Sequence, residues 1–246
     1  MGELIAVASG KGGTGKTSFT AAVSTAIAQS GKRVLCIDCD VGLRNLDISL
    51  GLSDQCALSF LDVCEGGYRL ADAAVHPAFR SLRFLTAPMN RPPEKIDPLQ
   101  FGAFLHAARQ SFDYIFLDAP AGLDAGFKLA AAYADRCILV TGPGPADLRD
   151  AVAAAQSLEL MGKENIRLVV NRVRPRLFKA MDLTIDDMMD TAGLPLLGIV
   201  PEDASVTLAA TFNHPLLTYK PRSSAARACT RIARRIMGRP EPISIR

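Results

Sequence analysis

A glycine-rich segment near the amino terminus constrains the fold of this chain more than any other feature. It fits the pattern G-x-x-x-x-G-K-[ST] in full and reads Gly10-Lys11-Gly12-Gly13-Thr14-Gly15-Lys16-Thr17. The apolar, β-branched run Leu4–Ser9 precedes it, and the alanine-rich stretch Thr17–Ser30, with helical spacing, follows it and stops at Gly31. Strand, glycine loop and helix therefore come in the order that a phosphate-binding loop requires. We expect the backbone N–H groups of this loop to face phosphate oxygens.

Two lysines share this loop. Lys16 stands where it reaches the β- and γ-phosphates of a nucleotide, and the Thr17 hydroxyl stands where it ligates Mg²⁺. Lys11 is additional, because an ordinary loop of this type has no second cation at that place. A further positive charge beside a transferred phosphoryl group stabilises the charge that develops during cleavage. The sequence therefore predicts binding of ATP or GTP with Mg²⁺.

Length and composition are those of a well-buried globular protein. The chain has 246 residues, 49% of them hydrophobic and 22% charged, so we expect one domain over residues 1–246. It enters a strand almost at once, and no apolar stretch approaches the roughly 20 residues that span a bilayer. We therefore predict a cytoplasmic protein with reduced cysteines. Cys36 and Cys39 form a C-x-x-C pair inside a predicted strand, where we expect core packing without a disulfide or a metal.

Strand-like and helical segments alternate along the rest of the chain. Apolar runs occur at Arg33–Asp38, Leu82–Pro88, Asp113–Pro120, Arg136–Pro143, Ile166–Val173 and Leu196–Val200. Helical patterns occur at Leu99–Ser111, Gly122–Tyr133, Ala146–Met161, Thr184–Thr191 and Ser223–Met237. This alternation predicts an α/β fold, a mostly parallel, doubly wound sheet with helices on both faces, as in P-loop NTPases. Runs that are apolar nearly throughout are typical of strands covered on both sides.

Three carboxylates follow predicted strands. Asp38 and Asp40 stand at the end of the second strand, and Asp118 ends the run Tyr114–Leu117. Ligands of such sheets gather at the carboxyl ends of the strands. We expect Asp118 to hold Mg²⁺ directly or through water, Asp38 to belong to the same metal site, and Asp40 to orient the attacking water. The alternative reading of a strand-end Asp is a helix cap or a turn former.

The chain resembles the MinD/ParA family of deviant Walker-A ATPases, and within it the division-site ATPases. The resemblance lies in Lys11, in the segments Asp38–Asp40 and Val41–Asp47, and then in Asp118–Gly122, Asn171–Val173 and Val200–Asp203. It covers nearly the whole chain. It implies an ATPase that forms a homodimer with ATP, recruits division-inhibitor or activator proteins to place the septum, and releases them on hydrolysis.

The resemblance also implies roles for individual residues. Lys11 would reach across the dimer to the partner's phosphates, and Asp40 would support hydrolysis with Asn45 near the dimer seam. Asp118 would be the Walker-B acid and Asn171 would pair with adenine, which favours ATP over GTP. The nucleotide and Mg²⁺ would be held by Gly10, Lys11, Gly12, Gly13, Thr14, Gly15, Lys16, Thr17 and Ser18, and the base and ribose by Asn171, Pro201, Glu202 and Asp203.

The carboxyl-terminal segment departs from the resemblance. Division-site ATPases of the family end in a short amphipathic helix that binds the membrane, whereas this chain stops at Arg239–Arg246, where that tail would begin. Between residues 216 and 246 there are eight Lys/Arg and one acid, a local charge of +7 in a chain of net charge +3. We expect residues 223–237 to form a basic surface helix. Contact with the inner face of the cell membrane stays open, and we expect no nucleic-acid binding.

Other functions within the family stay as alternatives. The basic carboxyl-terminal segment is the one feature in favour of a ParA-like partition ATPase that binds DNA non-specifically. A flagellar-placement ATPase is a third possibility, although such proteins usually carry an N-terminal extension before the first strand. An iron–sulphur carrier has the least support, because none of the six cysteines is placed for cluster binding across a dimer. The loop Gly142-Pro143-Gly144-Pro145 is richer in glycine and proline than in relatives, and the sequence gives no physical reason for it.

Overall fold

One continuous sheet organises the molecule in the computed structural model, which describes residues 1–55, 57–176 and 184–243. Its eight strands lie in the order β3-β4-β2-β5-β1-β6-β7-β8, and all neighbouring pairs are parallel except β3 with β4. The strands are β1 Glu3–Ala8, β2 Val34–Asp38, β3 Ala74–Val75, β4 Leu82–Leu85, β5 Tyr114–Asp118, β6 Arg136–Thr141, β7 Ile166–Val173 and β8 Leu196–Pro201. The predicted α/β class with a mostly parallel sheet is confirmed.

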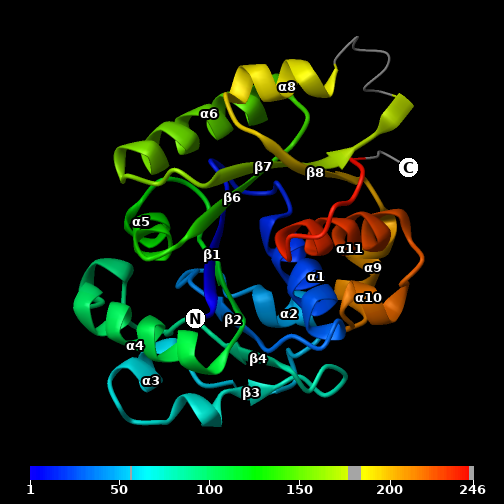
Figure 1. The fold of residues 1–246 in the computed structure, drawn as a ribbon. Helices are drawn as coiled ribbons and strands as arrows, with labels where there is room; N and C mark the ends of the chain where they lie inside the picture. Colours follow the sequence, from blue (N-terminus) through cyan, green and yellow to red (C-terminus); the bar gives the residue numbers. More distant parts are fainter. Residues whose placement is uncertain (56, 177–183, 244–246) are drawn as a thin grey trace.

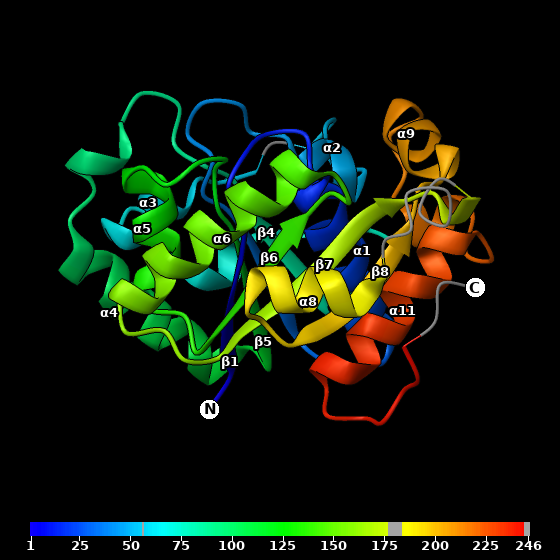
Figure 2. The same ribbon diagram turned by 90° about the horizontal axis from the view of Figure 1, so that it is seen from above.

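Helices cover both faces of this sheet, as Figures 1 and 2 show. One face carries α3 Phe60–Cys64, α4 Pro98–Ser111, α5 Ala125–Ala132, α6 Pro145–Leu160 and α8 Ile185–Ala192. The other carries α1 Lys16–Gln29, α2 Leu46–Leu50, α9 Ala204–Thr211, α10 Leu216–Tyr219 and α11 Ser224–Ile236. Two short 3₁₀ helices lie at Leu70–Asp72 and Pro93–Lys95. Because both faces are covered, β2 is buried along its whole length and β6 is buried after its first residue, Arg136.

The predicted elements differ from the observed ones mainly at short segments. The strand predicted as Leu82–Pro88 ends at Leu85, and the helix predicted as Gly122–Tyr133 begins only at Ala125. Helices α2, α3 and α10 were not predicted, because four or five residues are too few to show a helical period. Helix α9 was missed for another reason: its apolar residues are spread around the helix rather than gathered on one stripe.

The two cysteines of the C-x-x-C segment lie in the core. Cys36 in β2 and Cys39 just after it are both buried, and both are free thiols. Burial raises the pKa of Cys36 to about 12 and raises the pKa of Cys39 as well. Neither thiol therefore has the thiolate character that a redox pair needs. In the described part of the chain, no helix combines the length and apolar character needed to cross a bilayer.

Helix α11 packs along α1 and β8 (Figure 1), and it has the two-sided character that its sequence predicts. Ala226, Cys229, Ala233 and Ile236 are buried against the sheet side. Arg227 and Arg234 are exposed on the opposite side. Arg235 is half-buried and donates to the carbonyl of Leu197. The helix runs from Ser224 to Ile236, one residue shorter at each end than the range predicted from the sequence.

His76 joins the sheet edge to α2. It follows β3, is 1% exposed, and its Nε2 lies 2.8 Å from the Leu50 carbonyl oxygen at the end of α2. Its Nδ1 accepts hydrogen bonds from the backbone N–H groups of Ala78 and Phe79. Since Nδ1 is an acceptor, the proton of the neutral ring is on Nε2. Burial lowers the pKa of this histidine, although the bond to Leu50 opposes the shift.

This environment predicts a pH-dependent contribution of His76 to stability. The folded-state pKa lies below the ordinary value of 6.5, so the unfolded chain takes up the proton first as the pH falls. The contribution of His76 to the free energy of unfolding is therefore present above pH 6.5 and is lost as the pH falls below 6.5. The free energy of unfolding, measured in urea between about pH 7.5 and about pH 5.5, should therefore fall less in His76→Gln than in the wild type. The exposed His106→Gln is the control and should keep the wild-type slope; an unchanged slope in His76→Gln would contradict the assignment.

Candidate phosphate and base site

The loop between β1 and α1 has the backbone that phosphate binding needs. Gly13 and Gly15 have φ values of 81° and 83°, in the left-handed region that favours glycine. Gly15 is the residue before the first helical residue, Lys16, so the loop feeds directly into the N-terminus of α1. Free N–H groups and the positive end of the helix dipole meet there, which makes this position favourable for an anion. The Thr14 hydroxyl is buried and lacks a hydrogen-bond partner among the described residues.

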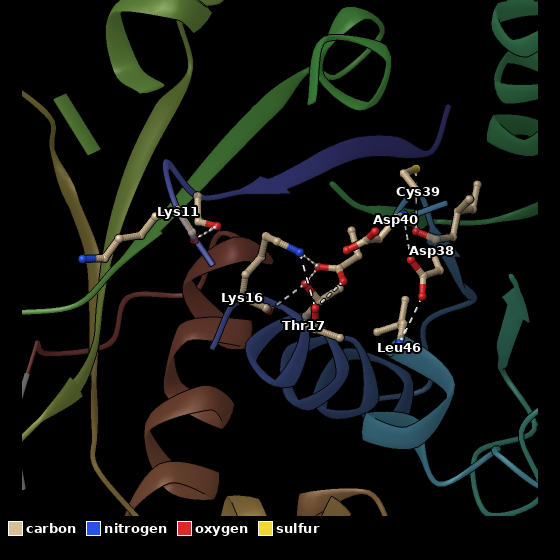
Figure 3. A network of polar contacts seen from close by, with 11 residues as sticks. Lys11, Lys16, Thr17, Asp38, Cys39, Asp40 and Leu46 are labelled. Atoms are coloured by element: carbon tan, nitrogen blue, oxygen red, sulfur yellow. Dashed lines mark hydrogen bonds and ion pairs between the residues drawn. The ribbon is translucent and has the colours of Figure 1, made fainter. Parts of the chain in front are cut away.

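Asp118 is the centre of a buried polar cluster at the end of β5. Its carboxylate is 1% exposed and lies 3.1 Å from Lys16 Nζ, which is itself 7% exposed. The Thr17 hydroxyl donates to Asp118 Oδ2 at 2.7 Å, and the Thr20 hydroxyl lies 2.8 Å from Oδ1. Figure 3 shows the side chains of Lys16 and Thr17 close together at the start of α1, where Lys16 Nζ lies 3.4 Å from the Thr17 hydroxyl oxygen. The sequence predicted three of these residues but not Thr20, which lies one turn after Lys16 on the same face of the helix.

Asp38 and Asp40 lie beside this cluster but bind backbone groups of their own loop. Asp38 pairs in register with Asp118 on the neighbouring strand. Its carboxylate accepts from the N–H groups of Asp40 and Leu46, and so holds the loop after β2 and the start of α2 together. Burial, reinforced by the charge of Asp118, raises the pKa of Asp38 to about 7. Asp40 accepts from the N–H groups of Gly42 and Leu43, the turn-forming arrangement that we named as the alternative reading.

Lys11 extends away from the cluster that holds Lys16, as Figure 3 shows. Its ammonium lies 2.7 Å from Asp147 and 3.7 Å from Asp150 on α6, and its side chain is 40% exposed. The hydrogen bond to Asp147 raises the pKa of Lys11. Asp147 also accepts from the N–H of Gly144. This lysine is therefore held by carboxylates on the outside of the loop.

The structure gives a physical reason for the glycines of the loop Gly142-Pro143-Gly144-Pro145. A Cβ built on Gly142 would lie 2.5 Å from the Asp147 carboxylate, and one on Gly144 would lie 2.9 Å from it. Side chains at these two positions would displace the carboxylate that pairs with Lys11. The two glycines of this loop thus make room for Asp147, a residue that the sequence interpretation did not select.

A cavity of about 210 Å³ opens beside the loop between the ends of β7 and β8. That volume is below the range typical of whole drug-sized ligands and suits a part of a nucleotide such as its base. The four residues predicted for base and ribose contact, Asn171, Pro201, Glu202 and Asp203, all line it. The other five lining residues are Gly15, Ser18, Arg172, Val206 and Thr207. Asn171 Nδ2 donates to the Thr14 carbonyl oxygen at 2.7 Å, so the amide orientation is fixed by the loop itself.

Two charged residues of the cavity wall are held by contacts that the sequence does not reveal. Asp203 accepts from Ser205 N–H, from Ala225 N–H and from the Ser224 hydroxyl, so one carboxylate connects the starts of α9 and α11. Burial alone would raise the pKa of Asp203, but these hydrogen bonds outweigh it and hold the pKa well below its usual range. Arg172, beside Asn171, pairs with Glu202, and both residues line the cavity.

The fold and these clusters define a P-loop nucleotide-binding protein with a second lysine in the loop. The sequence matches the family described as the CobQ/CobB/MinD/ParA nucleotide binding domain over residues 5–216. It is 39% identical over 251 residues to the septum site-determining protein MinD of Bacillus subtilis, covering all of this chain and 92% of that one. The chain belongs to this family and, within it, to the MinD group of septum site-determining proteins that place the division site.

Solved structures of MinD proteins agree with this assignment. The MinC:MinD cell division protein complex of Aquifex aeolicus superposes with a TM-score of 0.90 at 34% identity, covering 98% of each chain. The MinD of Pyrococcus horikoshii complexed with Mg-ADP superposes with a TM-score of 0.83 at 31% identity, covering 96% of each chain. The predicted family and fold are therefore confirmed, and the roles of individual residues stay predictions.

The cluster around Asp118 predicts that Thr20 supports the site before any nucleotide binds. Thr20→Val keeps the side-chain shape but removes a donor from a buried carboxylate, which should lower the free energy of unfolding by about 2 kcal/mol. Thr25→Val is a matched control, because Thr25 is equally buried in α1 and its hydroxyl bonds only helix carbonyls, those of Ala21 and Ala22. Urea unfolding of both variants without nucleotide measures the difference. Equal destabilisation would show that Asp118 does not depend on Thr20.

Proposed function

We propose that this protein is an Mg²⁺-dependent ATPase whose ATP-bound form is a homodimer that recruits division-site proteins. The observation that carries the proposal is the position of Lys11: a cation of the phosphate-binding loop that points out of its own pocket and stays 40% exposed. In that direction Lys11 is available to a second copy of the chain. ATP hydrolysis would then need two loaded subunits, and cleavage would end the association.

The residues of the loop fit a nucleotide with Mg²⁺. Lys16 and the loop N–H groups would hold the phosphates, and a phosphate oxygen would also give the buried Thr14 hydroxyl a partner. The Thr17 hydroxyl and the Asp118 carboxylate, 2.7 Å apart, are oxygen ligands of the kind that Mg²⁺ takes, with Asp38 on the adjacent strand. The metal would neutralise phosphate charge. Asp40 would orient the attacking water once its loop has closed on the nucleotide.

The geometry of Asn171 favours adenine over guanine. One N–H of Nδ2 donates to the Thr14 carbonyl, which leaves Oδ1 to accept from a base and the second Nδ2 N–H to donate to it. Adenine offers a matching pair at one edge, an exocyclic amine that donates and N7 that accepts, whereas guanine offers two acceptors there, O6 and N7. The cavity walls formed by Pro201, Glu202 and Asp203 would contact the base and ribose.

A division-inhibitor protein is the partner that the relatives suggest, since the Aquifex protein was solved as a MinC:MinD complex. The site of action would be the cytoplasm, with the inner face of the cell membrane as a peripheral location. A partition ATPase that binds DNA is less well supported. Arg234 pairs with Glu241 at 2.8 Å, and Arg235 donates to the carbonyls of Leu197 and Glu241, so part of the basic helix is already engaged.

Dimerisation and hydrolysis test the proposal together. Light scattering after size exclusion should show a monomer with ADP and a dimer with an uncleavable ATP analogue. Lys16→Ala should lose nucleotide binding, whereas Lys11→Ala should bind nucleotide, stay monomeric and hydrolyse ATP about a thousandfold more slowly. Lys32→Ala is the control and should behave as the wild type, because Lys32 precedes β2 and so lies at the amino-terminal end of the strands, away from the loop after β1. A wild-type protein that binds the analogue but stays monomeric at micromolar concentration would refute the dimer switch.

The contact between Lys11 and Asp147 predicts that Asp147 opposes dimerisation. Asp147→Asn removes the charge that holds the lysine but keeps an acceptor for the Gly144 N–H. With the ATP analogue bound, the dimer dissociation constant should decrease by about two- to fivefold, the range of an exposed ion pair. Asp150→Asn, whose carboxylate is 3.7 Å from the ammonium, should have a smaller effect. A weaker dimer in Asp147→Asn would mean that this carboxylate belongs to the dimer contact instead.

A further inference from the structure

Arg172 lies at an irregular point of the sheet, next to the base cavity. The register of β7 with β8 shifts between Val170 and Val173, and Arg172 has a φ of 59°. Only three non-glycine residues of the described chain have such a left-handed φ. The conformation is unfavourable for an arginine, so it persists only where surrounding contacts hold it.

The guanidinium of Arg172 uses its donors on two different segments. Nε and Nη2 bind the two carboxylate oxygens of Glu202 at 2.9 and 3.3 Å. Nη1 donates to the carbonyl oxygen of Gly13, in the phosphate-binding loop, at 3.0 Å. One planar guanidinium group thus connects Gly13, in the loop after β1, with Glu202, in the loop after β8, nearly 190 residues apart in sequence.

These two segments are the two halves of the candidate site. Gly13 belongs to the half that would hold phosphates, and Glu202 belongs to the wall of the cavity that would hold the base. No strand pairing joins them, because β1 and β8 lie apart in the sheet order. The side chain of Arg172 is 52% exposed, so its ion pair adds little to overall stability. Its effect is therefore on the relative position of the two halves.

We propose that Arg172 is a positioning residue that fixes the base wall relative to the phosphate-binding loop, so that one nucleotide engages both halves at once. The inference rests on the proposed nucleotide site and adds a residue and a role to it. A ligand that fills both halves gains from this preorganisation, whereas a ligand that fills only the phosphate half does not.

Calorimetric titration in the presence of Mg²⁺ compares ADP, which would fill both halves of the site, with pyrophosphate, which would fill only the phosphate half. Neither ligand carries the γ-phosphate that would drive dimerisation. In Arg172→Ala, ADP affinity should fall about tenfold while pyrophosphate affinity stays within about twofold. Arg172→Lys should behave like Arg172→Ala, since one ammonium cannot replace the planar guanidinium group. Glu202→Gln should reproduce the loss for ADP, and the double variant should add nothing. Arg91→Ala is the matched control, because Arg91 makes an equally short exposed pair with Glu65 away from the cavity.

Each other outcome overturns the inference. Equal losses for ADP and pyrophosphate would mean that Arg172 contacts phosphate or holds the loop itself. If Arg172→Lys bound ADP as tightly as the wild type, the positive charge alone would account for the effect of Arg172. If Arg172→Ala bound ADP as tightly as Arg91→Ala, Arg172 would have no positioning role. Urea unfolding of the variants should match the wild type, which excludes a general loss of folding. If the wild-type protein itself bound no ADP, the proposed function would fail, a result distinct from all of these.

Discussion

The buried carboxylate of Asp118 is the constraint on which the site depends. A charge that is 1% exposed must be paired and hydrogen-bonded, and Lys16, Thr17 and Thr20 supply those partners from the first two turns of α1. The same contacts fix the start of α1 against β5 and so shape the loop before it. Lys16 needs the carboxylate equally, because its ammonium is also buried. A phosphate that attracts Lys16 and a metal that takes the carboxylate would together replace this ion pair without leaving either charge unpaired.

Lys11 has the same kind of partner but the opposite exposure. Both lysines of the loop bind a carboxylate of their own chain, Lys16 inside the molecule and Lys11 at its surface. An ion pair in contact with water is weak and easily exchanged, whereas a buried one is lost only at high cost. In the proposed function this difference would separate the two lysines: Lys16 would bind the nucleotide of its own subunit, and Lys11 would exchange Asp147 for an anion brought by another molecule.

Local signals account for what the sequence could predict. The loop Gly10–Thr17, the buried strands and the acids Asp38 and Asp118 are each encoded within a few residues, and the parallel sheet then brings the strand ends together. Partners distant in sequence could not be predicted in this way. Asp147 and Arg172 became visible only in three dimensions, because each contacts a loop residue more than 130 positions away. Asp203 was predicted to contact a ligand, but its carboxylate is committed to the starts of α9 and α11.

The site lies where the sheet's own hydrogen bonds end, and this explains why side chains assemble it. Strand pairing fixes the backbone up to the carboxyl ends of β1, β5, β7 and β8, and single backbone bonds, such as those from Gly122 N–H to Ser9 and from Glu202 N–H to Val173, extend just beyond them. Polar side chains make the further connections: Asn171 to Thr14, Arg172 to Gly13 and Glu202, and Asp203 to the start of α11. The apolar core is independent of these bridges, so they can exchange partners when a ligand binds while the sheet and its helices stay in place.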